Sequence, residues 1–341
     1  MARLVVTGGM GFIGSCFVRR RLAAGKDEVV VVDKLTYAGN PNNLKEYKDD
    51  RNLTFVQGDV CDRKLMDRVT KSADALVHFA AETHVDRSIL EAGDFVRTDV
   101  MGTWSVLEAS RKNELDRVLI ISTDEVYGEA PGRPSTELDP LMPKSPYAAS
   151  KAGADRLTFS YFTTYGLPVV ISRCANNFGP YQHPEKLIPL FVTNALEDTP
   201  LPVYGTGTNT RDWVHVEDHC AALDLLLKAD RVEGETFNVG ASAERSILQI
   251  GEAILEALAK PKSLLQRVPD RPGHVVRHAV DWTKLRDRTG WMPKTTFEIG
   301  LPETIDWYRA NEWWWRPIRA GAFRDYYEVQ YHGRRKPSAR G

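Results

Sequence analysis

Short runs of β-branched residues alternate with longer helical patterns through the first half of the chain. In Glu28–Val32 four valines stand in a row, and Asp33 follows them. A strand that is apolar at every position suits a parallel sheet buried on both faces, since a half-buried strand alternates polar with apolar residues. The pattern therefore predicts an α/β fold with a doubly wound parallel sheet. Further strands are expected at Arg3–Thr7, Leu53–Gln57, Ala75–Phe79, Arg117–Ser122 and Pro168–Arg173.

The composition argues against several classes of protein. The 341 residues carry 45 Lys and Arg against 46 Asp and Glu, so broad electrostatic binding of nucleic acid or of an anionic membrane is not expected. No run reaches the roughly 18 apolar residues of a membrane-spanning helix, and the N-terminus leads directly into a strand, without a signal peptide. The four cysteines show neither a CxxC motif nor the spacing of metal ligands. We expect reduced thiols in a cytoplasmic protein, with no metal.

A glycine-rich segment follows the first expected strand. Gly8, Gly11 and Gly14 precede a helix that is expected to end near Ala24. Glycines at these positions let the backbone turn tightly and approach a pyrophosphate, which lies at the positive N-terminus of the helix. Asp33 ends the next strand, where a carboxylate accepts hydrogen bonds from ribose hydroxyls and repels a 2′-phosphate. The arrangement predicts a Rossmann-type domain that binds NAD rather than NADP. The alternative is a tight turn in another kind of α/β protein.

Tyr147 and Lys151 are four residues apart, so they share one face of a helix. Ser145 and Pro146 supply an N-cap and a first-turn proline just before them. A tyrosine with a pKa near ~10 is a poor base at neutral pH. A neighbouring ammonium and a positive nicotinamide ring would both stabilise the phenolate and lower that pKa. The pair therefore predicts a tyrosine base that takes a hydroxyl proton while hydride leaves for NAD.

Two adjacent carboxylates follow the strand expected at Arg117–Ser122. Asp124 and Glu125 come after Thr123 at the carboxyl end of a parallel strand, where doubly wound sheets place their active sites. For both side chains to reach one substrate, the backbone has to leave strand geometry near Thr123. Neighbouring carboxylates resist joint ionisation, which suits one to acid and one to base chemistry. The alternative is a solvated acidic turn.

The pattern changes after Cys174, where a smaller C-terminal substrate-binding lobe is expected. Loops rich in Asn, Pro and Gly are predicted at 176–189 and 200–210, with helices near Val216–Lys228 and Leu248–Leu258. The expected division is 1–173 plus about 210–238 for the Rossmann domain, about 174–209 plus 239–317 for the lobe, and 318–341 for a C-terminal extension with a basic tail. A packed aromatic segment is expected from Trp307, Trp313, Trp314 and Trp315.

Together these motifs resemble the extended short-chain dehydrogenase/reductase family. The glycine-rich segment, Asp33 and the pair Tyr147 and Lys151 carry that resemblance. Within the family, the chain is similar to the dTDP-glucose 4,6-dehydratases over nearly its whole length, to about Pro317. The most specific element of the similarity is Thr123-Asp124-Glu125. Further similar strings are Ala80–Ser88, Arg173–Gln182, Lys186–Pro189, Arg211–Trp213 and Asp270–His274.

The resemblance implies that dTDP-glucose is dehydrated to dTDP-4-keto-6-deoxyglucose with tightly held NAD. Carried onto this chain, the family's mechanism makes Tyr147 the base while hydride leaves C4, with Lys151 beside it and Thr123 hydrogen-bonded near the reacting oxygen. Glu125 then removes the C5 proton and Asp124 protonates the departing C6 hydroxyl, before hydride returns to C6. The five expected catalytic residues are Thr123, Asp124, Glu125, Tyr147 and Lys151.

The resemblance also assigns binding residues. Arg211 and Arg271 are candidates for the substrate's pyrophosphate, since the fixed fork of arginine suits phosphate oxygens. Taken singly, each binding residue has an ordinary alternative: His84 as a structural histidine, Asp59 as a loop aspartate. The residues expected at the substrate are His84, Thr123, Asn176, Lys186, Leu187, Pro202, Tyr204, Arg211, Arg271 and His274. The residues expected at the cofactor are Gly8, Gly11, Phe12, Ile13, Gly14, Asp33, Lys34, Thr36, Asp59, Val60, Ala80, Tyr147 and Lys151.

One departure from the family and several alternatives stay open. After Gly240 the family has a short loop that ends in an asparagine at the nucleotide, whereas this chain has a shorter segment that offers Ser246. A UDP-glucose 4,6-dehydratase carries a similar signature. An epimerase or decarboxylase on the same scaffold is another alternative, but an epimerase has no use for a carboxylate pair beside the nicotinamide. A non-catalytic NAD-binding regulator would be expected to lack catalytic residues. The resemblance further implies a homodimer through helices near Gly93–Lys112 and Pro146–Tyr165.

Overall fold

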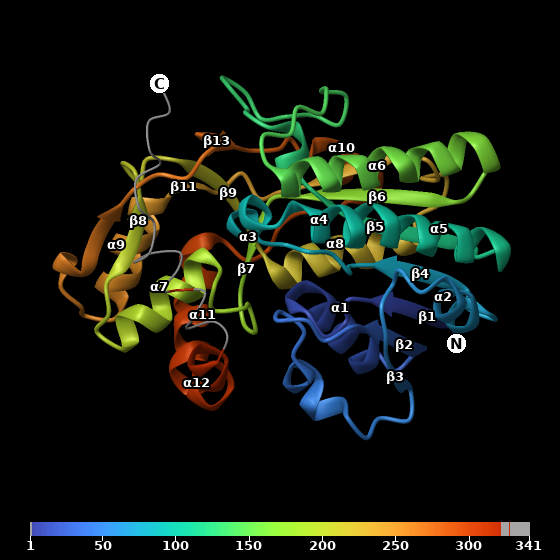
Figure 1. The fold of residues 1–341 in the computed structure, drawn as a ribbon, viewed down its shortest axis with the longest axis horizontal. Helices are drawn as coiled ribbons and strands as arrows, with labels where there is room; N and C mark the ends of the chain where they lie inside the picture. The colour runs from blue at the N-terminus through green and yellow to red at the C-terminus, as the bar shows by residue number, and fades with distance from the viewer. Residues whose placement is uncertain (1, 322–326, 328–341) are drawn as a thin grey trace.

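The fold has a larger and a smaller part, which lie side by side (Figure 1). The structure, a computed structural model, describes residues 2–321 and residue 327. The strands are β1 (Ala2–Thr7), β2 (Asp27–Asp33), β3 (Leu53–Gln57), β4 (Ala75–His78), β5 (Arg117–Thr123), β6 (Val169–Cys174), β7 (Asn176–Phe178), β8 (Leu201–Tyr204), β9 (Thr210–His215), β10 (Thr236–Val239), β11 (Glu244–Ser246), β12 (Leu265–Val268) and β13 (Arg277–His278). The α-helices are α1 (Phe12–Ala23), α2 (Arg63–Thr70), α3 (Val85–Leu90), α4 (Ala92–Phe95), α5 (Thr103–Lys112), α6 (Pro146–Tyr165), α7 (Leu187–Leu196), α8 (Val216–Lys228), α9 (Ile247–Ala257), α10 (Thr283–Thr289), α11 (Phe297–Ala310) and α12 (Glu312–Ala320). The other helical turns are η1 (Pro41–Tyr47), the π-helix η2 (Val96–Gly102), η3 (Asp124–Tyr127) and η4 (Lys262–Leu264).

The larger part is built on a parallel sheet. Among the described residues this sheet has seven strands in the order β10-β6-β5-β4-β1-β2-β3, and every neighbouring pair is parallel. The strand order reverses between β1 and β4. Open α/β sheets bind ligands at the carboxyl ends of the strands beside such a reversal. The topology therefore places a binding crevice after Thr7 and His78.

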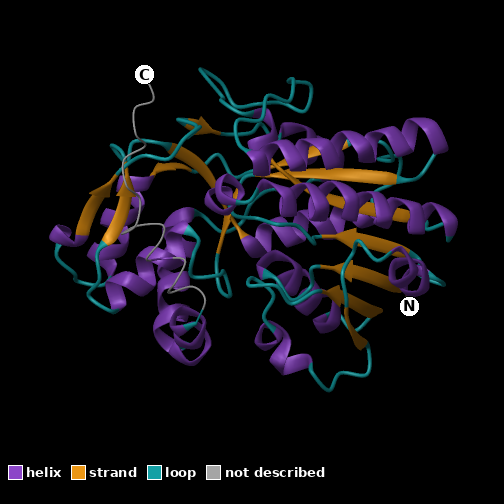
Figure 2. Cartoon of the chain, viewed as in Figure 1, coloured by secondary structure: helices purple, strands orange, loops and turns teal. Residues whose placement is uncertain are grey.

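Both faces of this sheet are covered by helices (Figure 2). Val29 and Val31 of β2 join the core that contains residues of α1 and α8. Val30 and Val32 join the opposite core, with residues of α2, α5 and α6. Because side chains alternate along a strand, consecutive valines supply both cores. The prediction of a doubly wound parallel sheet is confirmed.

The smaller part contains two further sheets. In the first, β9 pairs in parallel with β7 and β13 and antiparallel with β11. In the second, β8 and β12 are parallel neighbours. Helices α7, α9, α11 and α12 enclose a core that includes Phe191, Ile254 and Trp315. The residue bounds expected for the two domains stay a prediction.

Two segments expected to be loops contain strands and part of a helix. Strand β7 and the start of α7 lie within 176–189, and β8 lies within 200–210. The partners of these strands, β9 and β12, are distant in sequence. No local pattern marks such short strands, because their hydrogen bonds form only in the folded chain. The helices expected near Val216–Lys228 and Leu248–Leu258 are confirmed as α8 and α9.

The C-terminal tryptophans pack as expected. Trp314 and Trp315 are buried, and Trp307 stacks on Tyr181 with ring centroids 4.5 Å apart. Trp313 is the exception, since its side chain is half exposed. The expected basic tail, 333–341, lies outside the described residues. None of the helices in residues 2–321 is long and apolar enough to cross a membrane.

Candidate active site

The glycine-rich turn between β1 and α1 leaves no room for side chains. Gly8 has a φ of +69°, and a Cβ there would lie 2.6 Å from the backbone nitrogen of Ala80. A Cβ on Gly14 would lie 2.3 Å from the carbonyl oxygen of Gly8. Gly11 is the N-cap of α1. The turn thus brings bare backbone and a helix N-terminus to the carboxyl end of β1, as phosphate binding requires.

Two carboxylates stand at the ends of the next strands. Asp33 accepts hydrogen bonds from the backbone amides of Met10 at 2.9 Å and Leu35 at 2.8 Å, which hold its side chain beside the turn. Burial raises the pKa of Asp33 although these amides oppose the change. Asp59 pairs with Lys34 at 2.7 Å. Burial is the largest single influence and acts to raise the pKa of Asp59, but the hydrogen bonds from Lys34 and Cys61, together with the positive charge of Lys34, lower it overall.

A cavity of about 270 Å³ opens at this edge of the sheet. All of the residues expected at the cofactor line it, and so do all five expected catalytic residues. A turn that excludes side chains, a carboxylate at the end of β2 and a helix N-terminus together fit a dinucleotide. The cofactor candidates in the lining are Gly8, Gly11, Phe12, Ile13, Gly14, Asp33, Lys34, Thr36, Asp59, Val60, Ala80, Tyr147 and Lys151.

Helix α6 presents Tyr147 and Lys151 to the cavity. The Ser145 hydroxyl accepts a hydrogen bond from the Ala148 amide at 3.1 Å, and Pro146 occupies the first turn, so the expected N-cap is confirmed. The Lys151 ammonium donates to the carbonyl oxygen of Ile121 at 2.7 Å. This bond fixes the ammonium against β5.

The pKa of Tyr147 departs from the expected direction. Burial is the largest cause and raises the pKa well above 10; the negative charge of Glu125 raises it further, whereas a hydrogen bond with Thr123 lowers it. The expectation that a neighbouring ammonium lowers this pKa is therefore not met by the protein's own groups. The physical reason is the burial of the phenol, and the negative charges of Glu125 and Asp99 act in the same direction.

The backbone leaves strand geometry at Thr123, as expected. β5 ends there, and the Thr123 hydroxyl accepts a hydrogen bond from the Glu125 amide at 3.3 Å as the N-cap of η3. This tight turn brings Asp124 and Glu125 to the same cavity. The Thr123 hydroxyl also donates to Asp124 Oδ1 at 3.3 Å.

Asp124 is the more deeply buried of the two carboxyls, with 3% of its surface exposed. Burial raises its pKa to about 8, and the neighbouring charge of Glu125 acts in the same direction. Arg211 opposes the shift. Within the described residues Asp124 Oδ2 has no hydrogen-bond partner. At neutral pH Asp124 is therefore a protonated acid, available to donate into the cavity.

A second, smaller cavity joins the carboxylate turn to the predicted phosphate site. Glu125 lines both cavities, and Arg211 and Arg271 line the smaller one. Arg211 of β9 donates to the carbonyls of Thr210 at 2.7 Å and Val275 at 3.0 Å, so its guanidinium is held by neutral groups. Arg271 donates to Asp86 Oδ1 at 3.3 Å. Two cations thus lie beside the turn that carries Asp124 and Glu125, an arrangement that suits an anionic substrate.

The remaining substrate candidates divide into two groups. Asn176 and Lys186 line the large cavity, and Lys186 donates to the carbonyl oxygen of Thr83. Tyr204 donates to Asp86 Oδ2 at 2.9 Å, and its ring meets that of His274 edge to face at 6.2 Å. The candidates that line neither cavity are His84, Leu187, Pro202, Tyr204 and His274.

His84 and Ser246 both have structural partners. The His84 ring lies 3.3 Å from the carbonyl oxygen of Glu185, and burial lowers its pKa to about 4, so it is neutral. Ser246 caps α9 by accepting the amide of Gln249 at 3.2 Å, while the Gln249 side chain accepts the Ser246 amide. The hydroxyl that stands near the family's asparagine position is thus bonded within its own helix.

Several lining residues were not expected from the sequence. Glu82 lines the cavity, and burial raises its pKa to about 7, with Asp99 acting in the same direction. Asp99 lies behind it and accepts from Ser150 at 2.6 Å and from the Glu82 amide at 2.9 Å. The string Ala80–Ser88 could have pointed to Glu82, since it follows the carboxyl end of β4. Asp99 lies in a π-helix without any marked motif.

Comparison with known proteins identifies the family. A sequence model of the family described as GDP-mannose 4,6 dehydratase matches residues 5–304. A dTDP-glucose 4,6-dehydratase of Streptomyces niveus is 49% identical over 323 residues, covering 93% of this chain and 96% of that protein. The chain belongs to the dTDP-glucose 4,6-dehydratase family. Its resemblance to the extended short-chain dehydrogenase/reductases, inferred from motifs, is thereby confirmed.

Solved structures agree with membership of the dTDP-glucose 4,6-dehydratase family. The dehydratase DesIV from Streptomyces venezuelae, solved with NAD bound, is 48% identical and has a TM-score of 0.91, covering 93% of this chain and 99% of that one. A UDP-glucose 4-epimerase from Thermotoga maritima has a TM-score of 0.85 at 29% identity, covering 91% and 99%. The fold is therefore shared with epimerases. Only the residues of the site, and not the fold, can tell a dehydratase from an epimerase.

Proposed function

We propose that this protein is an NAD-dependent dTDP-glucose 4,6-dehydratase, which converts dTDP-glucose to dTDP-4-keto-6-deoxyglucose and water. The observation that carries the proposal is the meeting of two functional groups in one cavity. Tyr147 and Lys151 line it from α6, and the carboxyls of Asp124 and Glu125 line it from η3. The first pair suits the oxidation of an alcohol, and the second suits the removal of water.

NAD is the proposed cofactor, held at the glycine-rich turn. The backbone around Gly8 and Gly11 would receive the pyrophosphate, and Asp33 would accept hydrogen bonds from the ribose hydroxyls. When bound, NAD would supply the acceptor for a hydride from C4 of the sugar and the donor of that hydride to C6. The side chains of Lys34, Thr36 and Asp59 would border the adenosine half. The family relative DesIV, solved with NAD, supports this assignment.

The protein's residues carry the protons of the reaction. As its phenolate, a form that the positive nicotinamide ring of bound NAD would stabilise, Tyr147 takes the proton of the C4 hydroxyl. The new C4 ketone acidifies the hydrogen on C5. Glu125 removes that C5 proton, while Asp124 gives its proton to the C6 hydroxyl, which departs as water. Glu125 then returns its proton to C5. The proton that Tyr147 gained passes to solvent and Asp124 takes one up, so each group regains its starting form. Each such acid–base step contributes about 100- to 10,000-fold.

The different environments of the two carboxyls support this division of labour. Asp124 has a pKa of about 8 and holds a proton at neutral pH, so it suits the acid role. Glu125 is only half-buried and lines both cavities, so it can reach the sugar. A buried carboxyl that keeps its proton beside a more exposed carboxyl fits separate acid and base roles.

The substrate is proposed to extend from the large cavity toward the smaller one. Arg211 and Arg271 would bind its diphosphate, with Tyr204 and His274 beside them. Asn176 and Lys186 would bind near the glucosyl unit. His84, Leu187 and Pro202 belong to the same proposed set, and they border the other members in sequence or in the fold. The smaller lobe, about 174–209 plus 239–317, is proposed to supply most of these contacts.

The second candidate, a UDP-glucose 4,6-dehydratase, differs from the first in the nucleotide. Ser246 is bonded within the cap of α9, so the base contact differs from the family's asparagine. The 4-epimerase alternative is disfavoured because the paired carboxyls have no task in a simple epimerisation. Its structural relative is also much less similar in sequence, at 29% identity.

The proposal is tested with NAD-loaded protein and dTDP-glucose carrying deuterium at C4. We expect the ultraviolet absorbance of a 4-keto sugar in alkali, and deuterium in the methyl group of the product. UDP-glucose serves as the parallel substrate. Loss of the deuterium to solvent, or an epimerised sugar without the methyl group, would contradict the proposal.

A cytoplasmic homodimer is the proposed form of the enzyme. Exposed apolar side chains gather on η2 and α6, which pack together: Val96 is 52% exposed, Met101 48% and Phe159 38%. Exposed apolar groups on neighbouring helices favour a protein interface. Cys16, Cys61, Cys174 and Cys220 are free thiols, which fits a reducing compartment.

A further inference from the structure

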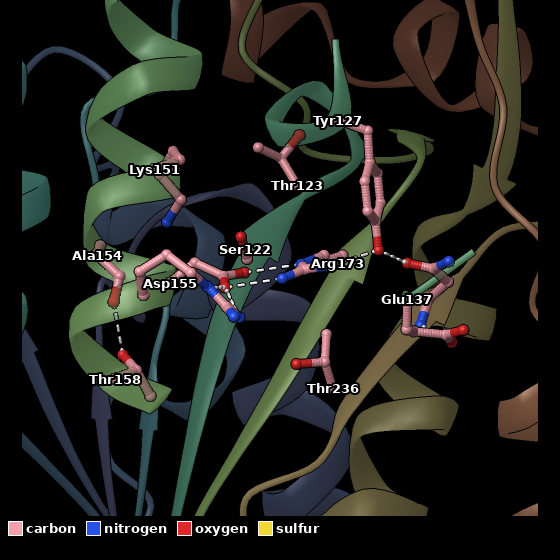
Figure 3. Close-up of polar contacts among 12 residues, drawn as sticks. Ser122, Thr123, Tyr127, Glu137, Lys151, Ala154, Asp155, Thr158, Arg173 and Thr236 are labelled. Carbon is pink, nitrogen blue, oxygen red and sulfur yellow. Dashed lines mark hydrogen bonds and ion pairs between the residues drawn. The ribbon is translucent and has the colours of Figure 1, made fainter. Parts of the chain in front are cut away.

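A network of buried hydrogen bonds links residues of α6, β6, η3 and β10 (Figure 3). Arg173 of β6 is 2% exposed and donates two hydrogen bonds to Asp155 of α6, at 2.8 and 2.9 Å. It donates a third, at 2.7 Å, to the hydroxyl of Tyr127. That hydroxyl donates in turn to Asn238 Oδ1 of β10 at 2.8 Å. The Tyr127 hydroxyl is thus fixed by one donor and one acceptor.

The acceptor end of the network is itself fixed. The Asn238 side-chain amide donates to the carbonyl oxygens of Ser135 at 3.0 Å and Asp281 at 3.1 Å. Its backbone amide donates to Glu137 at 2.8 Å. Asn238 is fully buried. The orientation of its oxygen toward Tyr127 is therefore set by three other contacts.

The network joins the two segments that carry the chemistry. Asp155 lies one turn beyond Lys151 and two turns beyond Tyr147, on the same face of α6. Tyr127 is the last residue of η3, the turn that begins with Asp124. Figure 3 shows Arg173 lying between Asp155 and Tyr127. One guanidinium thus connects α6, which carries Tyr147 and Lys151 and is called the oxidation helix below, with η3, which carries Asp124 and Glu125 and is called the elimination turn.

The contact with Tyr127 is not needed to balance the charge of Arg173. Asp155 already pairs with the guanidinium through both carboxylate oxygens and also accepts from the more exposed Arg156. Burial acts to raise the pKa of Asp155, but both arginines lower it. The neutral Tyr127 hydroxyl fixes the orientation and spacing of the groups that it bonds, but it adds no charge that would compensate the guanidinium. Buried polar groups of this kind specify geometry more than they add stability.

We propose that the Tyr127 hydroxyl is a positioning group, which holds the Asp124–Glu125 turn in register with Tyr147 and Lys151 so that water elimination follows sugar oxidation. The inference rests on the proposed function. Oxidation at C4 uses Tyr147 and Lys151 on α6, with Thr123 at the end of β5, whereas elimination across C5 and C6 uses groups on η3. Loosening η3 alone therefore slows the second step and spares the first.

The variant Tyr127→Phe tests this role, since it removes one oxygen atom and keeps the ring. NAD-loaded variant is mixed with dTDP-glucose while the near-ultraviolet absorbance of reduced nicotinamide and the yield of 4-keto-6-deoxy product are followed. We expect the absorbance to rise within about twofold of the wild-type rate. It should then persist, because elimination is slowed by about 10- to 100-fold when catalytic groups lose their alignment.

Two further variants make the test specific. Tyr161→Phe is the control: it removes a tyrosine hydroxyl of α6 that donates to Glu108 at 2.8 Å and takes no part in the network. We expect both steps to keep their wild-type rates in this variant. Arg173→Lys keeps the positive charge beside Asp155 but lacks the fork that also reaches Tyr127. It should reproduce the accumulation of reduced nicotinamide, and it replaces Tyr127→Phe if that variant does not fold.

The outcomes separate the positioning role from the proposed function. Equal slowing of oxidation and elimination in Tyr127→Phe and Arg173→Lys would overturn the positioning role, since it would indicate a general loss of structure. Wild-type rates for both steps would overturn it too. Failure of the wild-type protein to make any 4-keto-6-deoxy product would instead contradict the proposed function itself.

Discussion

At Asp124, burial and the adjacent charge of Glu125 raise the pKa of one carboxyl together. Asp33 is also buried, but its carboxylate accepts hydrogen bonds from two backbone amides. Asp59 pairs with Lys34, which favours its ionised form. Three aspartates at the carboxyl ends of strands of the same sheet thus have different properties. The difference comes from their hydrogen-bond donors, since Asp124 Oδ2 has none among the described residues.

The pKa of Asp124 predicts how the elimination step depends on pH. A carboxyl with a pKa of about 8 is protonated below that pH and loses its donor proton above it. The elimination rate should therefore fall as the pH rises through about 8. Single-turnover measurements across this range check the prediction. The variant Asp124→Asn should be slower at every pH and should lack this alkaline fall; a fall of the same shape in Asp124→Asn would assign it to another group.

Separate roles for Tyr147 and the carboxyl pair predict separate defects. Tyr147→Phe removes the base for the C4 hydroxyl, so reduced nicotinamide should form about 100- to 10,000-fold more slowly. Asp124→Asn with Glu125→Gln should still oxidise C4 while losing water slowly. Rapid-mixing absorbance together with product analysis measures both steps. If oxidation and elimination decline together in the carboxyl double variant, the roles are not separate.

At the scale of an element, helix α1 depends on how closely its first turn approaches β1. A Cβ on Gly14 would lie 2.3 Å from the carbonyl oxygen of Gly8. This oxygen belongs to the backbone, so it cannot move aside as the end of a flexible side chain can. Helix α6 depends instead on its cap, where Ser145 and Pro146 start the helix so that Tyr147 enters the cavity. Each helix positions its functional residues through its first turn.

Gly14→Ala and Gly25→Ala separate crowding from strain at the two ends of α1. Gly14→Ala should destabilise the fold by about 1–3 kcal/mol and weaken the retention of NAD, because the turn must shift. Gly25 has a φ of +65° and open space around it, so Gly25→Ala should cost about 1 kcal/mol through backbone strain alone. Thermal unfolding and NAD titration measure both. Equal NAD affinity in the two variants would argue against a tight turn at the cofactor.

At the scale of the whole molecule, the packing of the helices determines where apolar side chains remain exposed. Helices α5 and α6 lie side by side on one face of the large sheet (Figure 1). They pack on the sheet through residues such as Val106 and Tyr161. Their outer surface, with the preceding η2, exposes Val96, Met101 and Phe159. A second copy of the chain is the proposed cover for this surface.

The dimer proposal predicts that charge on this surface separates the subunits. Val96→Asp combined with Phe159→Asp should give a monomer, because a carboxylate buried in an apolar interface lacks a partner. Light scattering after size-exclusion chromatography measures the mass. Ile299→Asp is the control, since Ile299 is 53% exposed on α11, away from this surface. A double variant with the same mass as the wild-type protein would place the interface elsewhere.

The parts of the site that sequence patterns predicted are local ones. The glycine-rich turn follows from residues adjacent in the chain, and the sharing of a helix face by Tyr147 and Lys151 follows from their spacing. The consecutive valines of β2 predicted a sheet buried on both faces. The resemblance to the dehydratase family added the candidates on other segments, such as Arg211 and Arg271, which then proved to line one cavity with Glu125.

Other features depended on contacts between distant segments. Strands β7 and β8 formed within expected loops because their partners lie far along the chain. The protein's own groups raise the pKa of Tyr147, because burial and the charge of Glu125 act on it, and helix spacing shows neither of these. Asp99 and the link from Arg173 to Tyr127 carry no local motif at all.

The sequence by itself determined the sheet, the cofactor turn and the chemical groups available for the reaction, because backbone turns and helix spacing depend on near neighbours. Only the tertiary structure decided which of those groups holds a proton and how the oxidation helix connects to the elimination turn. Burial and long-range hydrogen bonds control both, and they exist only once distant segments have packed together.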